Sequence, residues 1–346
     1  MDLHLFISAE HPPDAHMGEK MAGHVEQLRL AREGGFDGVA IGNHLSYGDT
    51  AWFPPLETLL HLAPEAGDMQ IATCMLILPL YHPFQIAEQA ALLDAVSGGR
   101  FTLGVAPGWQ RDEFELMGLD FTRRIGRYLE GVDLIRRLFT EEEVNFAGRH
   151  FTAEDLTLAL KPVRRPRPPM WFGGSVDAAV ERAGRLADTR LGDSWVASSH
   201  LVGDVVKRQA ECFRETLEAL GKPMPARFPM LRNIVVAPDR QTAVRDAGPF
   251  LEASYRVFGQ WGLFRTIGGV GKDEPDLDEL LAGRVVMGSP EEVADELLSL
   301  AEATGCNRIV TRIQWLGMDQ RLVLRSIDLL ADRVLPMLRK ETRGEV

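Results

Sequence analysis

The segment from Ile71 to Trp109 constrains the fold more than any other part of the chain, because a strand, a helix and a second strand follow one another directly. It begins with a nearly unbroken apolar run, Ile71–Leu78, which is typical of a strand covered on both faces of a parallel sheet. From Phe84 to Val96 apolar residues recur at three and four residue spacing, and a Ser-Gly-Gly sequence then ends the helix. Phe101–Val105 is the next apolar strand. The segment therefore predicts an α/β fold.

The same alternation continues along the rest of the chain. Eight stretches are candidate strands: Asp2–Ser8, Gly38–Gly42, Gln70–Met75, Phe101–Ala106, Met170–Phe172, Asp193–Ala197, Asn233–Ala237 and Arg308–Ile313. Helical patterns lie between them at Lys20–Glu33, Leu56–Ala66, Ile125–Phe139, Ser175–Ala187, Leu201–Leu220, Arg240–Phe258, Pro290–Ala303 and Gln320–Leu338. These alternations favour a closed (β/α)8 barrel, the TIM barrel, for which about 250 residues is typical and insertions are common. An open doubly wound sheet is the alternative.

Composition indicates one large soluble domain that spans residues 1–346. The chain is 45% hydrophobic and 25% charged and has no obvious linker, so its core can be large. Its longest apolar run is far shorter than the roughly 20 residues that a membrane helix needs, and the N-terminus lacks a secretory pattern. We therefore expect a cytoplasmic protein that does not contact membranes. The net charge of −12 argues against a nucleic-acid partner, because phosphate binding depends on excess Lys and Arg.

Several kinds of site chemistry have no support in the sequence. Cys74, Cys212 and Cys306 are odd in number and widely spaced, so we expect neither a disulfide framework nor a zinc site. The Gly104–Gly108 loop, GVAPG, lacks the GxGxxG register of a dinucleotide fingerprint, and no HExxH or GxSxG motif occurs. The sequence therefore predicts no metal, no serine nucleophile and no resident nicotinamide.

Two segments exceed what a minimal barrel needs and are predicted to be insertions. Residues 141–169 contain VNFAGRHF, a short hairpin pattern with Gly at its turn, followed by a stiff proline-rich run. Residues 259–284 are rich in Gly and acidic residues, and a loop of that length in a compact domain is usually functional. We interpret the second segment as a lid.

In a parallel barrel the active site lies at the C-terminal ends of the strands, because the loops there are free to vary. His44 lies two residues past the apolar run VAIG, so a rigid strand end would hold an imidazole that can act as a base near neutral pH. The alternative is an ordinary structural histidine. For His82, which precedes a helix, we expect a capping contact. Trp109 can wall a planar cofactor, whereas we expect Trp171 and Trp195 in the core.

A second group of residues is suited to an anion. Gly173, Gly174 and Ser175 lead from a strand into a helix, where unpaired backbone N–H groups and the positive end of the helix dipole favour a phosphate. The alternative is that Ser175 caps its own helix. Arg124 and Arg127 begin the helix after the fourth strand and are candidates for charge-assisted contacts to the same phosphate, or else are surface residues.

Taken together, these segments resemble the bacterial luciferase-like flavin-dependent oxidoreductases. The pattern LILPLYHPFQIAEQAALLDAVSGGRFTLGVAPGW is similar to the most recognisable segment of that family, and it is followed by EF, by GLDF and by an Arg-rich helix start. The resemblance continues through VNFAGRHF, PRPPMWFGGS and MGSPEEVADEL, and so covers roughly the whole chain.

The resemblance implies a (β/α)8 barrel that binds FMN or, in some branches, an 8-hydroxy-5-deazaflavin coenzyme. Cys74-Met75 occupies the position where relatives have a non-prolyl cis peptide beneath the flavin ring. His44 matches a histidine implicated in proton transfer, and Gly108 with Trp109 matches the loop near the ring edge. The phosphate-binding region corresponds to Gly173, Gly174 and Ser175 with Arg124 or Arg127. Ala106 stands where luciferase has a reactive cysteine, so light emission is not implied, and Asn43 replaces an acidic residue found in several relatives.

The resemblance leads us to expect a flavin-dependent monooxygenase. Reduced FMN from a separate flavin reductase would react with O2 in a dry pocket, and one oxygen atom would pass to a small organic substrate. The lack of a nicotinamide fingerprint agrees with a separate reductase, and the resemblance suggests a homodimer. Two alternatives stay open, namely hydride transfer with the deazaflavin coenzyme and a non-catalytic flavin-binding subunit, since fold alone does not decide function.

Overall fold

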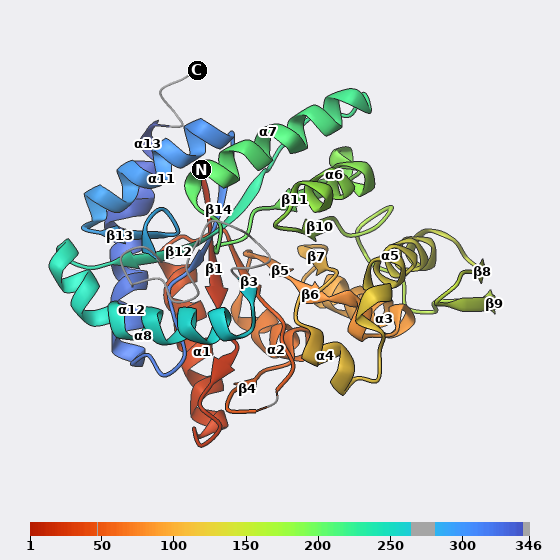
Figure 1. Ribbon diagram of the computed structural model, residues 1–346, viewed down its shortest axis with the longest axis horizontal. Coiled ribbons are helices and arrows are strands. Elements are labelled where there is room, and N and C mark those ends of the chain that lie inside the picture. The colour runs from red at the N-terminus through yellow and green to blue at the C-terminus, as the bar shows by residue number, and fades with distance from the viewer. Residues whose placement is uncertain (47, 264–280, 342–346) are drawn as a thin grey trace.

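A curled sheet of parallel strands forms the centre of the molecule (Figure 1). The computed structural model describes residues 1–46, 48–263 and 281–341. Along the sheet the strand order is β11 (Ser194–Val196), β10 (Met170–Gly173), β7 (Phe101–Ala106), β5 (Gln70–Thr73), β3 (Gly38–Ile41), β1 (Asp2–Ile7), β14 (Arg308–Arg312), β12 (Pro229–Val236) and β13 (Val285–Gly288), with β6 (Leu76–Ile77) paired to β7. Every ladder of this sheet is parallel.

All eight predicted strands belong to this sheet, which confirms the α/β fold. The sheet curls far enough that the residue after β11 meets β12, where Ala197 and Met230 form a bridge and the Leu231 N–H donates to the Ala197 carbonyl oxygen at 3.0 Å. A single bridge joins these two strands where the other neighbours form ladders. The predicted seventh strand begins four residues earlier than expected, at Pro229, because residues 229–233 pair with β14.

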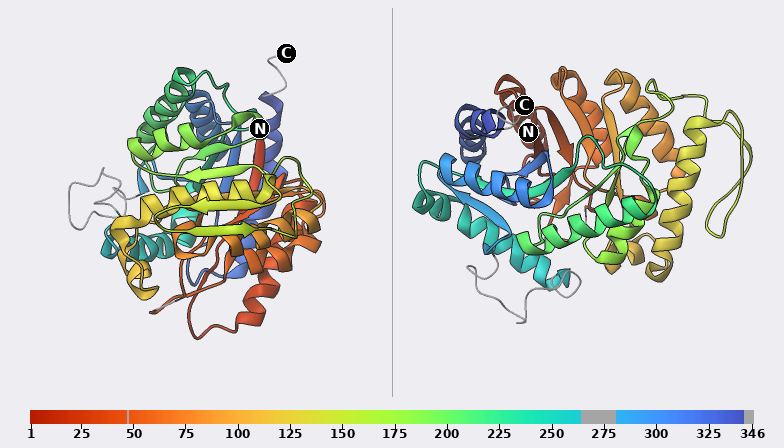
Figure 2. Two further views of the ribbon diagram at one scale, coloured as in Figure 1. Left: turned by 90° about the vertical axis from the view of Figure 1, so that its right-hand side faces the viewer. Right: turned by 90° about the horizontal axis from the view of Figure 1, so that it is seen from above.

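Helices lie around the outside of the sheet (Figure 2). They are α1 (Met17–Glu33), α2 (Pro55–Leu62), α3 (Pro83–Val96), α4 (Arg111–Leu116), α5 (Arg124–Thr140), α6 (Asp177–Leu186), α7 (Gly203–Ala219), α8 (Arg240–Gln260), α11 (Pro290–Thr304), α12 (Gln320–Leu329) and α13 (Leu335–Glu341). Their buried faces pack on the strands that precede or follow them, as in α1 on β1 and α3 on β7. None of the helices in the described ranges is long and apolar enough to cross a membrane.

Several short elements were not predicted from periodicity, among them the buried strand β13, which has only four residues. Helix α4 has only six residues, RDEFEL, which is too short for an apolar repeat to show. Strands β2 (Glu10–His11) and β4 (Ala51–Trp52) form a small antiparallel pair beside the main sheet. The predicted hairpin in residues 141–169 is confirmed, with β8 (Val144–Ala147) and β9 (Thr152–Leu156) antiparallel. Of the predicted lid, residues 264–280 lie outside the described residues.

The apolar run Ile71–Leu78 is not the single strand that its composition predicted. It is divided into β5 and β6 by a cis peptide bond between Cys74 and Met75, at the position that the family resemblance indicated. Just before the break, the Thr73 hydroxyl accepts from the Gly104 N–H and donates to the Gly104 carbonyl oxygen, both at 2.8 Å. This side chain thus joins β5 to β7 directly beneath the cis bond.

Gly104→Ala is expected to destabilise the protein by about 3 kcal/mol, because the new methyl group would overlap the Thr73 carbonyl oxygen and neither backbone can move away. Urea unfolding measures the effect. Gly18→Ala is the matched control, since only the side chain of His16 lies near its Cβ position. Equal stability of the two variants would contradict the close approach of β5 and β7 at this point.

Candidate active site

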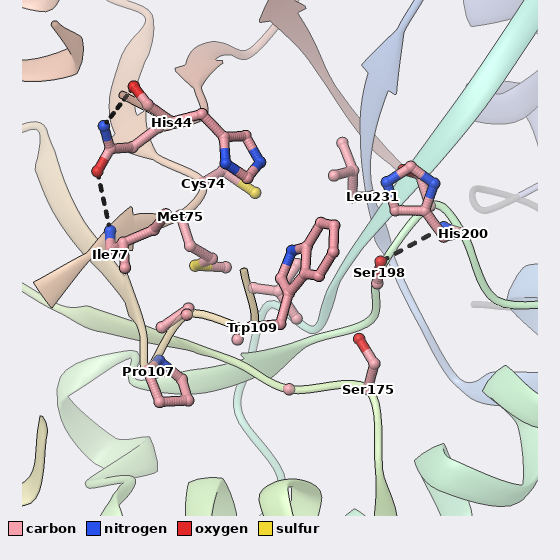
Figure 3. A pocket seen from close by; sticks show the side chains of 18 of the residues that line it. His44, Cys74, Met75, Ile77, Pro107, Trp109, Ser175, Ser198, His200 and Leu231 are labelled. Atoms are coloured by element: carbon pink, nitrogen blue, oxygen red, sulfur yellow. Dashed lines mark hydrogen bonds between the residues drawn. The ribbon is translucent and has the colours of Figure 1, made fainter. Parts of the chain in front are cut away.

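A cavity of about 400 Å³ opens at the carboxyl ends of the strands, as expected for the active site of such a sheet. Nine of the ten predicted site residues line it, namely His44, Cys74, Met75, Gly108, Trp109, Arg124, Gly173, Gly174 and Ser175. Figure 3 shows several of these side chains around one space, although they come from loops far apart in the sequence. The volume is within the range of small-molecule and cofactor sites.

Arg127 is the predicted site residue that the cavity does not include. Its Nε donates to the Pro79 carbonyl oxygen at 2.7 Å, and its guanidinium lies 4.4 Å from the ring centroid of Phe151. These contacts join α5 to the turn between β6 and α3 and to the hairpin. His82 lies nearby and caps α3 by accepting from the Phe84 N–H, as predicted.

His44 forms a pair with Glu113, a residue that sequence reasoning did not select. The His44 Nδ1 lies 3.0 Å from Glu113 Oε1, and the same oxygen accepts from the Leu45 N–H at 2.9 Å. The Glu113 carboxylate is completely buried, whereas 16% of the His44 side chain is exposed. A carboxylate on Nδ1 selects one tautomer and orientation of the ring, so Nε2 is left for the cavity.

The segment around the cis peptide is held by Asn43. Its side-chain oxygen accepts from the Ile77 N–H at 3.1 Å and from the Tyr81 hydroxyl at 3.2 Å. Met75 lies against Gly173, where a Cβ would come within 2.8 Å of the Met75 Cγ. Burial raises the pKa of the Cys74 thiol to about 12, so this cysteine stays protonated and is not a nucleophile.

The other end of the cavity is positively charged. Helix α6 begins here with Val176 as its N-cap, so the alternative that Ser175 caps the helix is wrong. Arg124 and Arg182 both line the cavity, and the pKa of Arg124 is lowered by burial and then by the charges of Arg182 and Arg111. No carboxylate among the described residues pairs with Arg182. Backbone donors at a helix start and uncompensated arginines together favour an anion.

One of the two predicted core tryptophans, Trp195, supports this end of the site. Trp171 and Trp195 are buried, which confirms their predicted place in the core. The Trp195 Nε1 donates to the Gly174 carbonyl oxygen at 2.9 Å and so fixes the loop that precedes α6. Gly174 itself has no room for a side chain, because a Cβ would lie 2.5 Å from the Ala179 Cβ.

An aromatic wall runs along one side of the cavity. The ring centroid of His44 lies 4.9 Å from that of Trp52, 6.1 Å from Trp109 and 5.8 Å from Trp261. Phe258, at the end of α8, continues the wall at 5.7 Å from Trp261. Of these residues, His44, Trp52, Trp109 and Phe258 line the cavity, so their ring surfaces form an apolar side next to the His44 imidazole.

Sequence reasoning missed several residues of the cavity region, among them Glu113, Arg182 and His200. Glu113 belongs to the EF pattern of the family resemblance, which was the only available signal. Arg182 lies one and a half turns into a helix, and His200 is in an irregular loop, so neither follows a strand end directly. Within the described ranges, no cluster of three His, Cys, Asp or Glu residues could hold a metal ion.

The family model of the luciferase-like monooxygenases matches residues 1–308, and the chain belongs to this family of enzymes. It is 24% identical over 321 residues to the oxygenase component of a flavin-dependent trigonelline monooxygenase from Acinetobacter baylyi, covering 91% of this chain and 83% of that protein. The protein is therefore an oxidoreductase of the monooxygenase kind.

Solved structures share the fold. Monooxygenase RslO1 from Streptomyces bottropensis has a TM-score of 0.83 at 23% identity, over 97% of this chain and 99% of that one. The oxygenating constituent of 3,6-diketocamphane monooxygenase from Pseudomonas putida, in complex with FMN, has a TM-score of 0.79 at 19% identity, over 97% and 98%. An F420-dependent secondary alcohol dehydrogenase has a TM-score of 0.76 at 21% identity, over 98% and 99%.

Proposed function

We propose that this chain is the oxygenase component of a two-component flavin monooxygenase, which uses reduced FMN and O2 to oxygenate a small organic substrate. A separate reductase would supply the reduced FMN, and the working unit would be a homodimeric, cytoplasmic (β/α)8 barrel. The observation that carries this proposal is one cavity with the His44–Glu113 pair at one side and with Arg124, Arg182 and the start of α6 at the other. The similarity to the trigonelline and diketocamphane monooxygenases supports it.

The residues present fit FMN. A flat ring needs an apolar floor without projecting side chains, and the loops at Gly108 and Gly173 supply one, since a Cβ at either position would collide with Ile77 or Met75. The phosphate needs donors and positive charge, which the start of α6, Arg124 and Arg182 provide. Cys74 and Met75 lie between these two parts and would support the ring from below.

Bound FMN, in its reduced form, supplies the two electrons that activate O2. The protein contributes placement, exclusion of water and control of protons. His44 holds or moves a proton at Nε2, and Glu113 keeps the ring in the orientation that this requires. The aromatic wall of Trp52, Trp109 and Phe258 keeps the reacting space dry.

Arg182→Gln is expected to weaken FMN binding by about 10- to 100-fold, because it removes a charge-assisted contact worth about 1.5–3 kcal/mol. Riboflavin, which lacks the phosphate, should bind the variant and the wild type equally. Titration of the oxidised flavins by fluorescence quenching gives both dissociation constants. The double variant Ser175→Ala, Arg124→Gln should show the same selectivity.

Arg185→Gln is the matched control, since Arg185 lies on the same helix, is exposed and pairs with Glu181 instead of lining the cavity. It should bind FMN like the wild type. Equal losses of FMN and riboflavin in Arg182→Gln would refute the phosphate assignment.

Anaerobic titration with reduced FMN and, separately, with the reduced 8-hydroxy-5-deazaflavin coenzyme tests the alternative of hydride transfer, which the likeness to the F420-dependent dehydrogenase keeps open. Each anaerobic complex is mixed with air-saturated buffer. Rapid oxidation of the FMN complex supports the monooxygenase proposal. Tight binding of the deazaflavin without a reaction with O2 would contradict the monooxygenase proposal and support hydride transfer.

A further inference from the structure

His200 lies across the cavity from His44 and has no role in the chemistry described above. Figure 3 shows the two rings on opposite sides of the space, His44 at the end of β3 and His200 in the loop after β11. The His200 ring lies against Phe258 and Tyr255, with centroid distances of 4.8 Å and 6.0 Å. Its Nδ1 is buried without a hydrogen-bond partner, and the ring edge that carries Nε2 faces the cavity.

The tautomer of His200 follows from these surroundings. Burial, followed by the charges of Arg312, His44 and Arg284, lowers the pKa of His200 to about 3, so the imidazole is neutral at physiological pH. A neutral ring carries one proton. On Nδ1 that proton would be a buried donor without an acceptor, which is less favourable than an unpaired acceptor lone pair at the same place. The proton therefore lies on Nε2, and His200 presents a hydrogen-bond donor to the cavity.

The charged residues around His200 determine which kind of ligand group can bind beside it. Arg312 lines the cavity in a buried ion pair with Glu10. Arg284 donates from its Nε to the His200 carbonyl oxygen at 3.1 Å. His44, the remaining neighbour, pairs with Glu113. Glu10 compensates the charge of Arg312, and Arg284 is not part of the cavity lining. The guanidinium N–H groups of Arg312 still favour an electron-rich oxygen over a cationic group at this point of the cavity.

The shape of the same region favours a flat ligand. The rings of Trp52, His44 and Phe258 line the cavity, and Phe258 contacts His200. Trp261 contacts both His44 and Phe258 without lining the cavity itself. Neighbouring rings of this group have centroid distances of 4.9–5.8 Å and so form a continuous aromatic surface. Such a surface binds a planar aromatic ring best, because stacked and edge-to-face contacts are favourable. His200 lies at the end of this wall, where a substituent of such a ring would reach it.

We propose that the substrate is a planar aromatic or conjugated compound with a carbonyl or carboxylate oxygen, and that this oxygen accepts a hydrogen bond from His200 Nε2. This inference rests on the proposed function, since it takes the cavity to be the site of oxygenation. His200 is then the residue that determines which end of the substrate faces Arg312 and which end lies on the aromatic wall.

Calorimetric titration of the FMN-saturated protein with 2-acetylnaphthalene and with 2-ethylnaphthalene tests the proposal, because the two probes differ mainly in the carbonyl oxygen. The wild type should bind the acetyl compound about 10-fold more tightly, as one net hydrogen bond of about 1 kcal/mol or slightly more implies. His200→Phe should reduce this preference to within about 2-fold. His200→Gln, which keeps a donor, should restore part of it. The cation trimethyl(2-naphthyl)ammonium should bind no better than 2-ethylnaphthalene.

Equal affinity of the wild type for the two neutral probes, a preference that survives in His200→Phe, or tight binding of the cation would overturn the proposal. FMN titration of the same protein separates this result from the proposed function. Failure of the wild type to bind FMN refutes the proposed function, whereas FMN binding without a carbonyl preference refutes the role of His200 alone. His200→Gln keeps the proposal testable if His200→Phe does not fold.

Discussion

His44→Ala is expected to lower turnover by about 10²- to 10⁴-fold while FMN affinity stays within about 3-fold of the wild type, which is the usual effect of removing a positioned acid or base. The reason is geometric. The Glu113 carboxylate holds Nδ1 at 3.0 Å, so Nε2 is the ring atom available to the reacting groups. Incorporation of oxygen from labelled O2 into product measures turnover, and fluorescence quenching measures FMN affinity.

Glu113→Gln provides a second measurement on the same pair. It retains an oxygen that can accept from the Leu45 N–H but removes the negative charge, so turnover should fall less than in His44→Ala and its pH profile should move. His82→Ala is the control, since this histidine caps α3 and is not part of the cavity lining. Turnover of His44→Ala within 3-fold of the wild type would remove His44 from the mechanism.

The free energy of unfolding should fall by several kcal/mol as the pH is lowered from 7 to 5. Burial and nearby positive charge lower the pKa of His24 and of His200 to about 3, and that of the fully buried His4 well below its ordinary value. In the unfolded chain each titrates near pH 6.5. The unfolded state thus binds more protons below pH 6.5, and stability that is fully present above this pH is lost as the pH falls towards the folded pKa. Each residue contributes about 1.4 kcal/mol per pH unit.

Urea unfolding between pH 5 and 7.5 tests this dependence. His24→Gln should show a slope smaller by about one proton, because the variant no longer has a group that titrates only on unfolding. Replacement of an exposed residue, His61→Gln, should leave the slope unchanged. If His24→Gln and the wild type have the same slope, the imidazole of His24 is not held neutral in the folded protein.

The candidate site was predictable to the extent that its residues follow strand ends directly. His44, Cys74, Trp109 and Gly173 do so, and the cavity includes all four. Arg127 was selected for its place at a helix start, but the direction of its side chain depends on how α5 packs on the hairpin, and the guanidinium lies over Phe151 instead. Sequence position alone does not determine which face of that helix turns inward.

Glu113 and His200 show a second limit of predicting site residues from the sequence. Glu113 reaches His44 across 69 residues of sequence, from a short helix that no periodicity predicted. His200 is placed by an irregular loop after β11, and its neutral state depends on burial and on Arg312, which comes from the far end of the chain. Contacts of this kind depend on sheet register and loop packing, which are not encoded in local residue patterns.

The sequence by itself determined the alternation of strands and helices, because apolar spacing and turn residues act over a few neighbouring positions. Through its family pattern it also indicated the cis peptide at Cys74–Met75. The tertiary structure alone decided which side chains share the cavity, that Arg124 and Arg182 line it while Arg127 does not, and that His200 lies across it from His44. These features depend on contacts between residues far apart in the chain, on burial and on the electrostatic effect of all nearby charges. Such contacts form only when the sheet has folded into its curled shape.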